Sequence, residues 1–511
     1  MADLEKEKYD LVVIGSGLGG LVSAAIFAKE GKKVCVLEKN KQIGGSLQTF
    51  VRNRVIFDSG VHYVGGLDKG QNLFMLFQYL GIIEKLKMKR LDDHVFDEIR
   101  LPNDPVIYKY AQGYDNFIRT LSEHFPGEEE AIQAYCDKIR DTCSKFPLYN
   151  LRTGDYFEKV GALELDTKAY IASITDNPKL QHILGGNNFL YAGSGDKTPF
   201  YVHALVLNHY IESSYKFLDG GSQIARELSR VITATGGVIQ KHANVSKLVE
   251  EGGTIAYAEL ADGRKVRGEL FISNVHPQQT LRMTQSNMIK AAYRNRINSL
   301  ENTISTFYIN AVMKKDSFKY INHNINVWNV NDAWSATEYT EKSWPPGYVI
   351  YFSASSKQGE YADGMTIMTY MRYDEVKQWE GTFNTVSEEN DRGEDYNAFK
   401  IAKAEKLLDL VEVDFPGFRD HIAEYYTASP LTARDYIGTD DGTLYGFAKD
   451  HKEPLRTFIS PRTKIPNLYM TGQNLNMHGV LGVTVSALNT CAQIFGMEYL
   501  LDKINNVKET V

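Results

Sequence analysis

The feature that most constrains this chain is a glycine-rich turn between an apolar strand and a helix, close to the start of the sequence. The apolar run Leu11–Ile14 is followed by GSGLGG at positions 15–20, an apolar helical pattern to about residue 28, and a second apolar run at 33–37. In such a turn the first glycine permits the sharp bend, the second lets backbone approach a pyrophosphate, and the third lets helix and strand pack closely. The N–H groups at the start of the helix favour phosphate. The sequence therefore predicts a dinucleotide-binding βαβ unit.

An acidic residue ends the second strand of this unit. Glu38 lies 38 − 15 = 23 residues after Gly15. A carboxylate at this distance accepts hydrogen bonds from a ribose diol and disfavours a 2′-phosphate. We therefore assign to the dinucleotide site Gly15, Gly17, Leu18, Gly20, Glu38 and Lys39.

A second glycine pair and an aromatic–acidic motif follow the βαβ unit. Residues 43–66 read IGGSLQTFVRNRVIFDSGVHYVGG. This stretch resembles the phytoene desaturase, carotenoid isomerase and retinol saturase branch of the flavin-dependent amine-oxidase-like superfamily, and it is most similar to the retinol saturase version. The resemblance implies FAD as the cofactor, with Gly45, Ser46 and His62 beside it.

Later stretches carry the same resemblance. The segment PFYVHALVLNHY at 199–210 leads to a Gly-Gly-Ser motif at 220–222, and TGQN at 471–474 precedes HGVLGV at 478–483. A helix that begins near Gly482 can stabilise negative charge on a reduced flavin. In this superfamily a β-meander also crosses the FAD domain near the adenine. The resemblance thus implies cofactor contacts at Val245, Gly472, Gln473, Gly482 and Val483.

The predicted fold is α/β, with a Rossmann-type FAD-binding domain and an inserted α+β substrate-binding domain. We expect the FAD-binding domain, a parallel sheet plus a β-meander, to comprise residues 1–70, 215–289 and 456–511. The substrate-binding domain then comprises 71–214 and 290–455. Aromatic residues make up 12% of the chain. Most of them belong in a core, and the resemblance implies that others line a tunnel for an apolar ligand.

The chemistry that the resemblance implies is hydride transfer to or from a carbon–carbon double bond of a polyene or isoprenoid lipid. The flavin carries the hydride, and saturation also needs a proton donor. The motifs offer His203, Tyr210 and His478 for that task. The spacing of His203 and His209 is poor for a metal, and no carboxylate cluster joins them, so we expect no metal site. A second strand–GxGxxG–helix unit is missing from the sequence, so electrons would come from a transient donor such as NAD(P)H, or pass to another acceptor.

Three alternatives remain open at this stage. One is a redox-neutral, flavin-dependent cis/trans isomerase of carotenoids. Another is a non-enzymatic prenyl-lipid carrier on the same scaffold, similar to the Rab GDP-dissociation inhibitors, although a carrier does not need the complete glycine turn. The third is an amine oxidase, although its covalent-flavin cysteine and aromatic cage are not identifiable here. The substrate and the direction of reaction also stay open.

Charge and cysteine content bear on partners and compartment. The net charge of −7 argues against nucleic acid as a partner. The four cysteines form no CxxC pair, which favours a reducing compartment. No run reaches the ~18 apolar residues of a membrane span. We therefore expect a cytoplasmic protein whose membrane contact, if any, is peripheral, and we leave its oligomeric state open.

Overall fold

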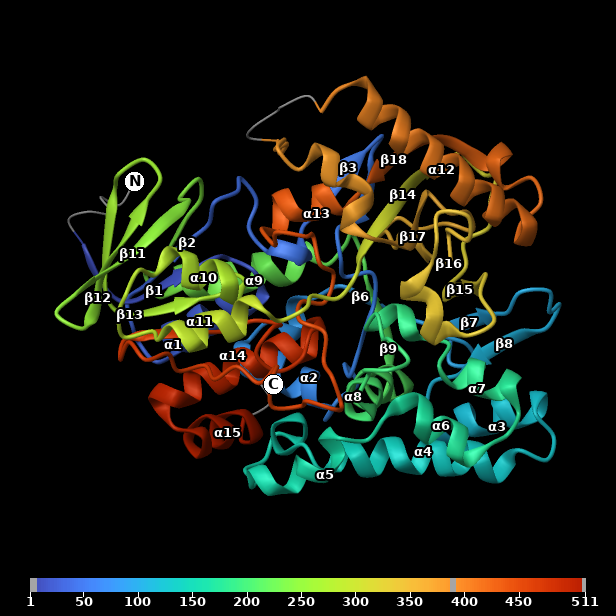
Figure 1. The fold of residues 1–511 in the computed structure, drawn as a ribbon, viewed down its shortest axis with the longest axis horizontal. Coiled ribbons are helices and arrows are strands. Elements are labelled where there is room, and N and C mark those ends of the chain that lie inside the picture. The colour runs from blue at the N-terminus through green and yellow to red at the C-terminus, as the bar shows by residue number, and fades with distance from the viewer. Residues whose placement is uncertain (1–6, 387–391, 508–511) are drawn as a thin grey trace.

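Two large β-sheets organise the chain, and each is covered by its own helices (Figure 1). The computed structural model describes residues 7–386 and 392–507. In the view of Figure 1 the first sheet lies at the left, and the second lies at the upper right. Chain segments pass several times between the two, so neither sheet is built from one continuous stretch of sequence.

The first sheet begins with the predicted βαβ unit. Strand β1 (Lys8–Ile14) pairs in parallel with β2 (Val34–Leu37), and helix α1 (Leu18–Lys29) connects them. Nearly the whole of α1 is buried, because two later helices, α9 (Ser222–Ala234) and α14 (Gly479–Phe495), pack against it. The small residues of α1 allow this close packing on both sides.

Later segments complete this first sheet. Its order is β10-β2-β1-β13-β12-β11, and β19 pairs with β13. Strands β10, β2, β1, β13 and β19 run parallel, whereas β11, β12 and β13 form an antiparallel meander. The later strands are β10 (Val238–Gln240), β11 (Val245–Glu251), β12 (Thr254–Leu260), β13 (Lys265–Ser273) and β19 (Leu468–Met470). The parallel sheet with a β-meander is thus as predicted.

The second sheet is mainly antiparallel. Its order is β18-β14-β17-β16-β15-β7-β8, in which β15 and β7 alone among these seven strands pair in parallel. Its strands are β7 (Asp97–Arg100), β8 (Ile107–Tyr110), β14 (Ser305–Met313), β15 (Asn324–Trp328), β16 (Gly347–Phe352), β17 (Gly364–Met371) and β18 (Ile422–Ala428). Strands β14, β16 and β17 are almost wholly buried and rich in aromatic and β-branched residues, as expected of strands covered on both faces.

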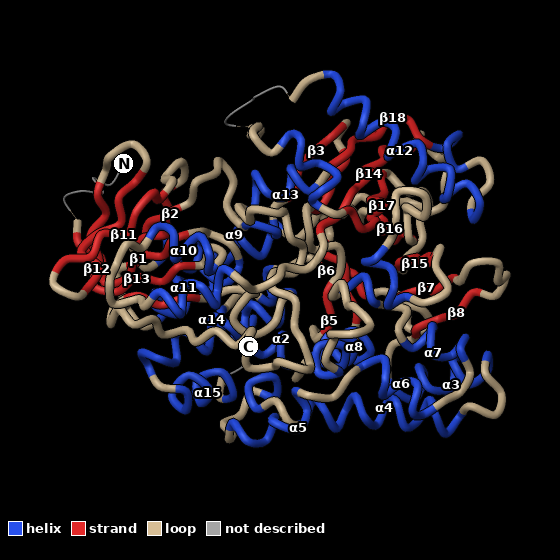
Figure 2. Tube along the Cα trace, viewed as in Figure 1, coloured by secondary structure: helices blue, strands red, loops and turns tan. Residues whose placement is uncertain are grey.

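Two small sheets lie at the junction. Strand β9 (Ser214–Phe217) pairs with both β5 (Val64–Gly65) and β6 (Met88–Arg90), and β3 (Thr49–Arg52) forms a hairpin with β4 (Val55–Asp58). Figure 2 shows helices gathered along the lower edge of the molecule in that view. The remaining helices are α2 (Asn72–Leu80), α3 (Tyr114–His124), α4 (Glu129–Ser144), α5 (Val160–Leu163), α6 (Thr167–Ile174), α7 (Pro178–Leu184), α8 (Phe200–Glu212), α10 (Pro277–Met283), α11 (Ala291–Asn298), α12 (Glu394–Asp414), α13 (Pro430–Ile437) and α15 (Met497–Asn505).

The packing of α2 and α11 differs from the expected domain boundaries. Helix α2 was expected in the substrate-binding domain, yet its residues Leu73, Leu76, Phe77 and Leu80 lie in the apolar cluster of α1 and α14. Helix α11 likewise contributes Ile297 to the cluster beneath the β-meander. The apolar faces of both helices are buried against the elements around the first sheet. The packing around that sheet therefore continues across the boundaries expected at residues 70 and 289.

None of the helices in the described ranges is long and apolar enough to cross a membrane.

Candidate functional site

The glycine turn folds as its spacing predicts. Gly15 has a φ of 89°, in the left-handed region that favours glycine. A Cβ on Gly20 would lie 2.1 Å from the carbonyl oxygen of Gly15, so α1 could not pack on the turn with any other residue there. Leu18 is the first residue of α1, and Gly17, which precedes it, has no side chain with which to cap the helix. The first-turn N–H groups are therefore directed at this turn, as phosphate binding requires.

Glu38 lies at the end of β2, where its carboxylate closes the turn. Its oxygens accept hydrogen bonds from the backbone N–H and the hydroxyl of Ser16, and from the N–H of Asn40 at 2.8 Å. An ionised carboxylate has about four acceptor sites, so capacity for a ribose hydroxyl remains. The chain just before β11 also comes close, because Ala243, two residues before Val245, donates a hydrogen bond from its N–H to the carbonyl of Glu38. The ammonium of Lys39 donates to the carbonyl of Asp435 in α13 at 3.0 Å, so this side chain is held by α13.

Glycines from two other segments converge on the turn. A Cβ on Gly45 would lie 3.2 Å from the Cα of Gly17, and a Cβ on Gly19 would lie 3.3 Å from the backbone of Gly472. Gly44 also forms an isolated bridge with Gly17. Such a cradle of bare backbone beside a helix N-terminus fits the pyrophosphate of a dinucleotide. Side chains at these positions would fill it.

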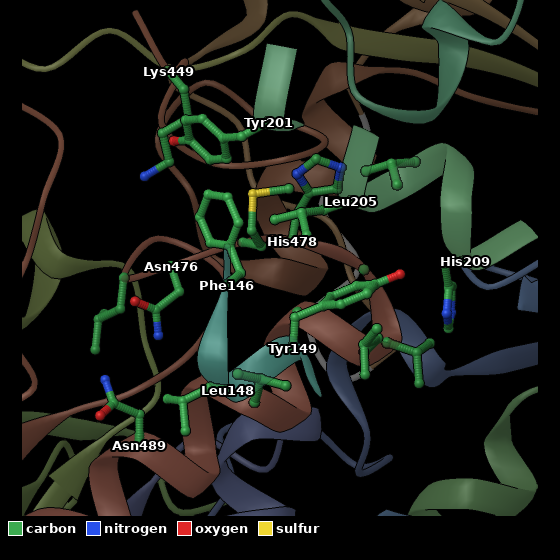
Figure 3. Close-up of a pocket in the computed structure, with 18 of the residues that line it drawn as sticks. Phe146, Leu148, Tyr149, Tyr201, Leu205, His209, Lys449, Asn476, His478 and Asn489 are labelled. Carbon is green, nitrogen blue, oxygen red and sulfur yellow. The ribbon is translucent and has the colours of Figure 1, made fainter. Parts of the chain in front are cut away.

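A cavity of about 910 Å³ lies between the second sheet and helices α8 and α14 (Figure 3). A cavity of this size can hold a large organic ligand. Helix α8 contributes one face, with side chains spaced four and five residues apart, as expected for a helix that lies along the cavity. Its wall is largely apolar and aromatic and includes His62, Tyr63, Phe146, Tyr149, Tyr201, Leu205, Tyr210, Tyr308, Tyr351, Tyr445 and His478.

The start of α14 joins the glycine cradle to this cavity. Gly472 and Gln473 follow β19, and six residues after Gly472 the N-cap residue His478 begins α14. Residues 479–482, including Gly482, line the cavity, whereas Val483 lies behind them and is partly buried against the cluster of α1. The positive end of the α14 dipole therefore opens into the cavity.

The segment after the second glycine pair supplies the opposite wall. Ser46 lies in a short 3-10 helix, Gly45–Leu47, and its side chain is exposed. His62 lines the cavity, and its ring stacks on Tyr351 with centroids 4.2 Å apart. Burial lowers the pKa of His62 to about 3, so this imidazole is neutral over the physiological range.

The three predicted proton donors have different surroundings. His203 is fully buried and absent from the cavity wall, and its two ring nitrogens are bonded to the hydroxyls of Tyr135 at 2.6 Å and Tyr191 at 2.8 Å. The prediction of His203 as a proton donor is therefore wrong, because both ring nitrogens are hydrogen-bonded to tyrosine hydroxyls within the helical layer, away from the cavity. His478 and Tyr210 both line the cavity.

His478 is a hydrogen-bond acceptor toward the cavity. A carbonyl can only accept, so the contact of Nε2 with the Leu190 oxygen at 3.0 Å fixes the proton on Nε2. Burial lowers the pKa of His478 to about 4. Tyr210, by contrast, has no hydrogen bond from its hydroxyl to any residue of 7–386 or 392–507, and burial raises its pKa. Of the three candidates, Tyr210 alone has an uncommitted proton on the cavity wall.

Sequence reasoning missed a buried charged group behind this wall. Lys216, in β9, is 1% exposed, and its ammonium has no hydrogen-bond partner within the described ranges. Desolvation lowers the pKa of Lys216 to about 7 and raises the pKa of Asp58 and of Asp97 to about 7 each. Asp97 accepts a hydrogen bond from Tyr63 of the cavity wall at 2.9 Å. The alternation of the short strand SYKF placed Lys216 inward, but nothing in the sequence distinguishes it from an exposed lysine.

Metal ligation finds no support in the geometry. Across the described parts of the chain, no group of three His, Cys, Asp or Glu side chains is arranged to hold a metal ion.

The fold and the site define the class of Rossmann-type oxidoreductases with an inserted second domain. The family model described as an NAD(P)-binding Rossmann-like domain matches residues 13–80. Among solved structures, an oxidoreductase from Methanosarcina mazei aligns with a TM-score of 0.64 at 17% identity, covering 94% of this chain and 98% of that one. Putrescine oxidase bound to putrescine aligns with a TM-score of 0.61 at 12% identity, covering 96% of this chain and 99% of that one. These likenesses confirm the predicted fold class.

Sequence relatives narrow the class further. The chain is 27% identical to the all-trans-retinol 13,14-reductase of Rattus norvegicus, over 94% of this chain and 85% of the relative. It is 25% identical to the human enzyme of the same name, over 99% and 88%. The prolycopene isomerase of Arabidopsis thaliana chloroplasts is 26% identical, over 98% and 84%. The chain is a homologue of these retinol reductases and prolycopene isomerases, which confirms the resemblance inferred from its motifs.

Proposed function

We propose that the protein is an FAD-dependent oxidoreductase that acts on carbon–carbon double bonds of a polyene or isoprenoid lipid. The observation that carries this proposal is the position of the α14 N-terminus. It follows Gly472 of the glycine cradle on one side and lines the aromatic cavity on the other. A flavin whose pyrophosphate occupied the cradle would have its ring system at the cavity, against the positive end of this helix.

The helix terminus and side chains of the cavity would have separate roles around such a flavin. Bound flavin supplies hydride transfer, and the protein orients the substrate and adjusts the electrostatics. The α14 N-terminus stabilises negative charge at the cavity. The aromatic wall excludes water and holds an extended apolar chain, and Tyr210 holds a proton at its hydroxyl where a substrate carbon would lie. The intact cradle argues against a carrier that does without FAD.

The experiment that tests this function begins with the purified chain reconstituted with FAD. We expect bound flavin absorbance near ~450 nm. Anaerobic photoreduction followed by a panel of polyenes should then reoxidise the flavin with at least one member, and the product should gain two hydrogen atoms. Failure to retain flavin after reconstitution would contradict the proposal. The same panel run with NAD(P)H in place of photoreduction tests whether NAD(P)H is a direct electron donor.

A second candidate is redox-neutral cis/trans isomerisation of a carotenoid. It is favoured by the similarity to prolycopene isomerases, which is of the same degree as that to the retinol reductases. Product mass separates the two reactions, because an isomer has the mass of its substrate.

Contact with a membrane surface would bring an apolar ligand to the cavity. Leu455, Phe458 and Tyr499 line the cavity at its rim, and they are 61%, 44% and 46% exposed. Apolar side chains grouped in this way are typical of interaction sites. Co-sedimentation with lipid vesicles should fall when Leu455 and Phe458 are both changed to Asp. Unchanged sedimentation of that variant would contradict membrane contact at this rim.

A further inference from the structure

One lysine lies within the wall of the large cavity without an acidic partner. Lys449, on the loop between α13 and β19, lines the cavity with its side chain (Figure 3). Throughout residues 7–386 and 392–507 no carboxylate lies within salt-bridge distance of its ammonium, and its one hydrogen bond is a long contact of 3.4 Å to the carbonyl of Thr457. An ammonium in apolar surroundings is costly unless it is paired.

The other charged groups of the wall do not provide that pair. Arg152 is already bound to Glu158. The acidic wall residues Asp155 and Glu498 are exposed at the rim, and Asp155 caps the 3-10 helix Tyr156–Lys159. Lys449 is thus a cation of the wall that has no counter-ion among the described protein groups. Desolvation lowers its pKa to about 8, which leaves most of it charged at neutral pH.

The neighbourhood of Lys449 is suited to the end of a long chain. Helix α8 lines the cavity from Tyr201 to Tyr210, a span of nine residues or about 13–14 Å. In the view of Figure 3, Lys449 lies at the Tyr201 end of this span and His209 at the other. The hydroxyl of Tyr201 also has no hydrogen bond to another residue in the described ranges, so a second donor lies on the same wall. Between the two ends the wall is formed by apolar and aromatic side chains.

We propose that Lys449 binds the carboxylate of an elongated unsaturated carboxylic acid whose hydrocarbon chain extends along α8 toward Tyr210. One ammonium with an adjacent hydroxyl suits a single carboxylate. The proposal rests on the proposed function only in assigning the double bonds to the Tyr210 end, because binding of the acid requires no turnover.

The test compares two ligands with one carbon skeleton, all-trans-retinoate and all-trans-retinol, on the FAD-reconstituted protein. Dissociation constants are measured by ultrafiltration and polyene absorbance. We expect wild type to bind retinoate at least tenfold more tightly than retinol. Lys449→Met should weaken retinoate about tenfold or more, the usual size of a hydrogen bond to a charged group, and leave retinol within twofold. Lys449→Arg should retain most of the preference.

The matched control is Lys452→Met, which removes the same charge from the same loop at an exposed position outside the cavity. It should bind both ligands as wild type does. Equal affinity of wild type for the two ligands would overturn the proposal without any variant, and so would equal weakening of both by Lys449→Met. If retinoate binds through Lys449 but no polyene reoxidises the flavin, the carboxylate site stands and the proposed function fails.

Discussion

The imidazole of His478 donates a hydrogen bond from Nε2 to the carbonyl oxygen of Leu190 at 3.0 Å. This bond fixes the tautomer, and burial holds the pKa of the ring at about 4. His478 therefore faces the cavity as a neutral acceptor. Glutamine at this position can donate the same bond, so His478→Gln should retain kcat within about fivefold, and its kcat should show the same pH profile between pH 5 and 8 as wild type. Loss of a titration from that profile in the variant would show instead that His478 is the acid.

Substitution of Tyr210 should lower kcat more than substitution of His478. Its hydroxyl is on the cavity wall and uncommitted, so Tyr210→Phe should lower kcat by about 10²–10⁴, the usual contribution of a general acid, with flavin binding retained. The control is Tyr445→Phe, because the Tyr445 hydroxyl already donates to the carbonyl of Phe189 at 2.6 Å. Steady-state kinetics with the best polyene provides the measurement. Equal effects of the two substitutions would remove the catalytic role of Tyr210.

Gly20→Ala should disrupt the cofactor cradle by contact with backbone. The new Cβ would lie 2.1 Å from the carbonyl oxygen of Gly15, and strain of this kind costs about 1–3 kcal/mol or more. We expect a lower melting temperature and less FAD bound per chain. Gly161→Ala in α5 is the control, since a Cβ there meets no atom within 4 Å, and it should be neutral or slightly stabilising. Full FAD occupancy in Gly20→Ala would contradict the close packing of α1 on the turn.

Lys216 should make folding stability depend on alkaline pH. Its pKa is about 7 in the folded chain and about 10.4 when unfolded. Between these values the unfolded state binds more protons, so the free energy of unfolding rises with pH, by up to about 1.4 kcal/mol per pH unit. Below pH 7 the ammonium is charged in both states, and its contribution no longer changes with pH.

Urea unfolding at pH 7 and pH 9 measures this effect. Wild type should gain stability over that interval relative to Lys216→Met, which in turn should be more stable than wild type at pH 7. Lys452→Met, at an exposed position and not among the groups that shift the pKa of Lys216, should keep the wild-type slope. Parallel pH dependences of wild type and Lys216→Met would mean that Lys216 titrates normally.

Much of the structure around the first sheet was predictable from sequence, because phosphate binding at a glycine turn depends on backbone groups. The turn at Gly15–Gly20 and the acid at Glu38 follow from local spacing that only a few structures satisfy. The helix expected to begin near Gly482 begins at Gly479. The convergence of Gly45 and Gly472 on that turn came from the family resemblance, since the segments lie more than 400 residues apart in sequence.

The cavity and the elements around it were less predictable, because the contacts there depend on tertiary packing. His203 and Tyr210 lie seven positions apart on nearly the same face of α8, about 10–11 Å along its axis. The tertiary packing at each position, which the sequence does not show, gives them different environments. The burial of Lys216 and the place of Lys449 in the cavity wall are likewise invisible in sequence, where a lysine is most often exposed. The packing of α2 and α11 on the first sheet's layer could not be predicted for a related reason, because the sequence does not show which sheet buries an apolar helix face.

The pairing of β19 with β13, and of α14 with α1, has a consequence for how the protein is made. The ribosome finishes β2 and must add residues 38–467, that is 430 residues, before β19 begins, which takes roughly 20–90 seconds at typical rates of synthesis. During that time the apolar face of α1 that later packs against α14 is uncovered, and the glycine cradle lacks Gly472. The cofactor can therefore be captured fully only after translation is nearly complete. We expect a nascent chain stalled before residue 468 to expose this apolar face to chaperones and to lack the complete glycine cradle.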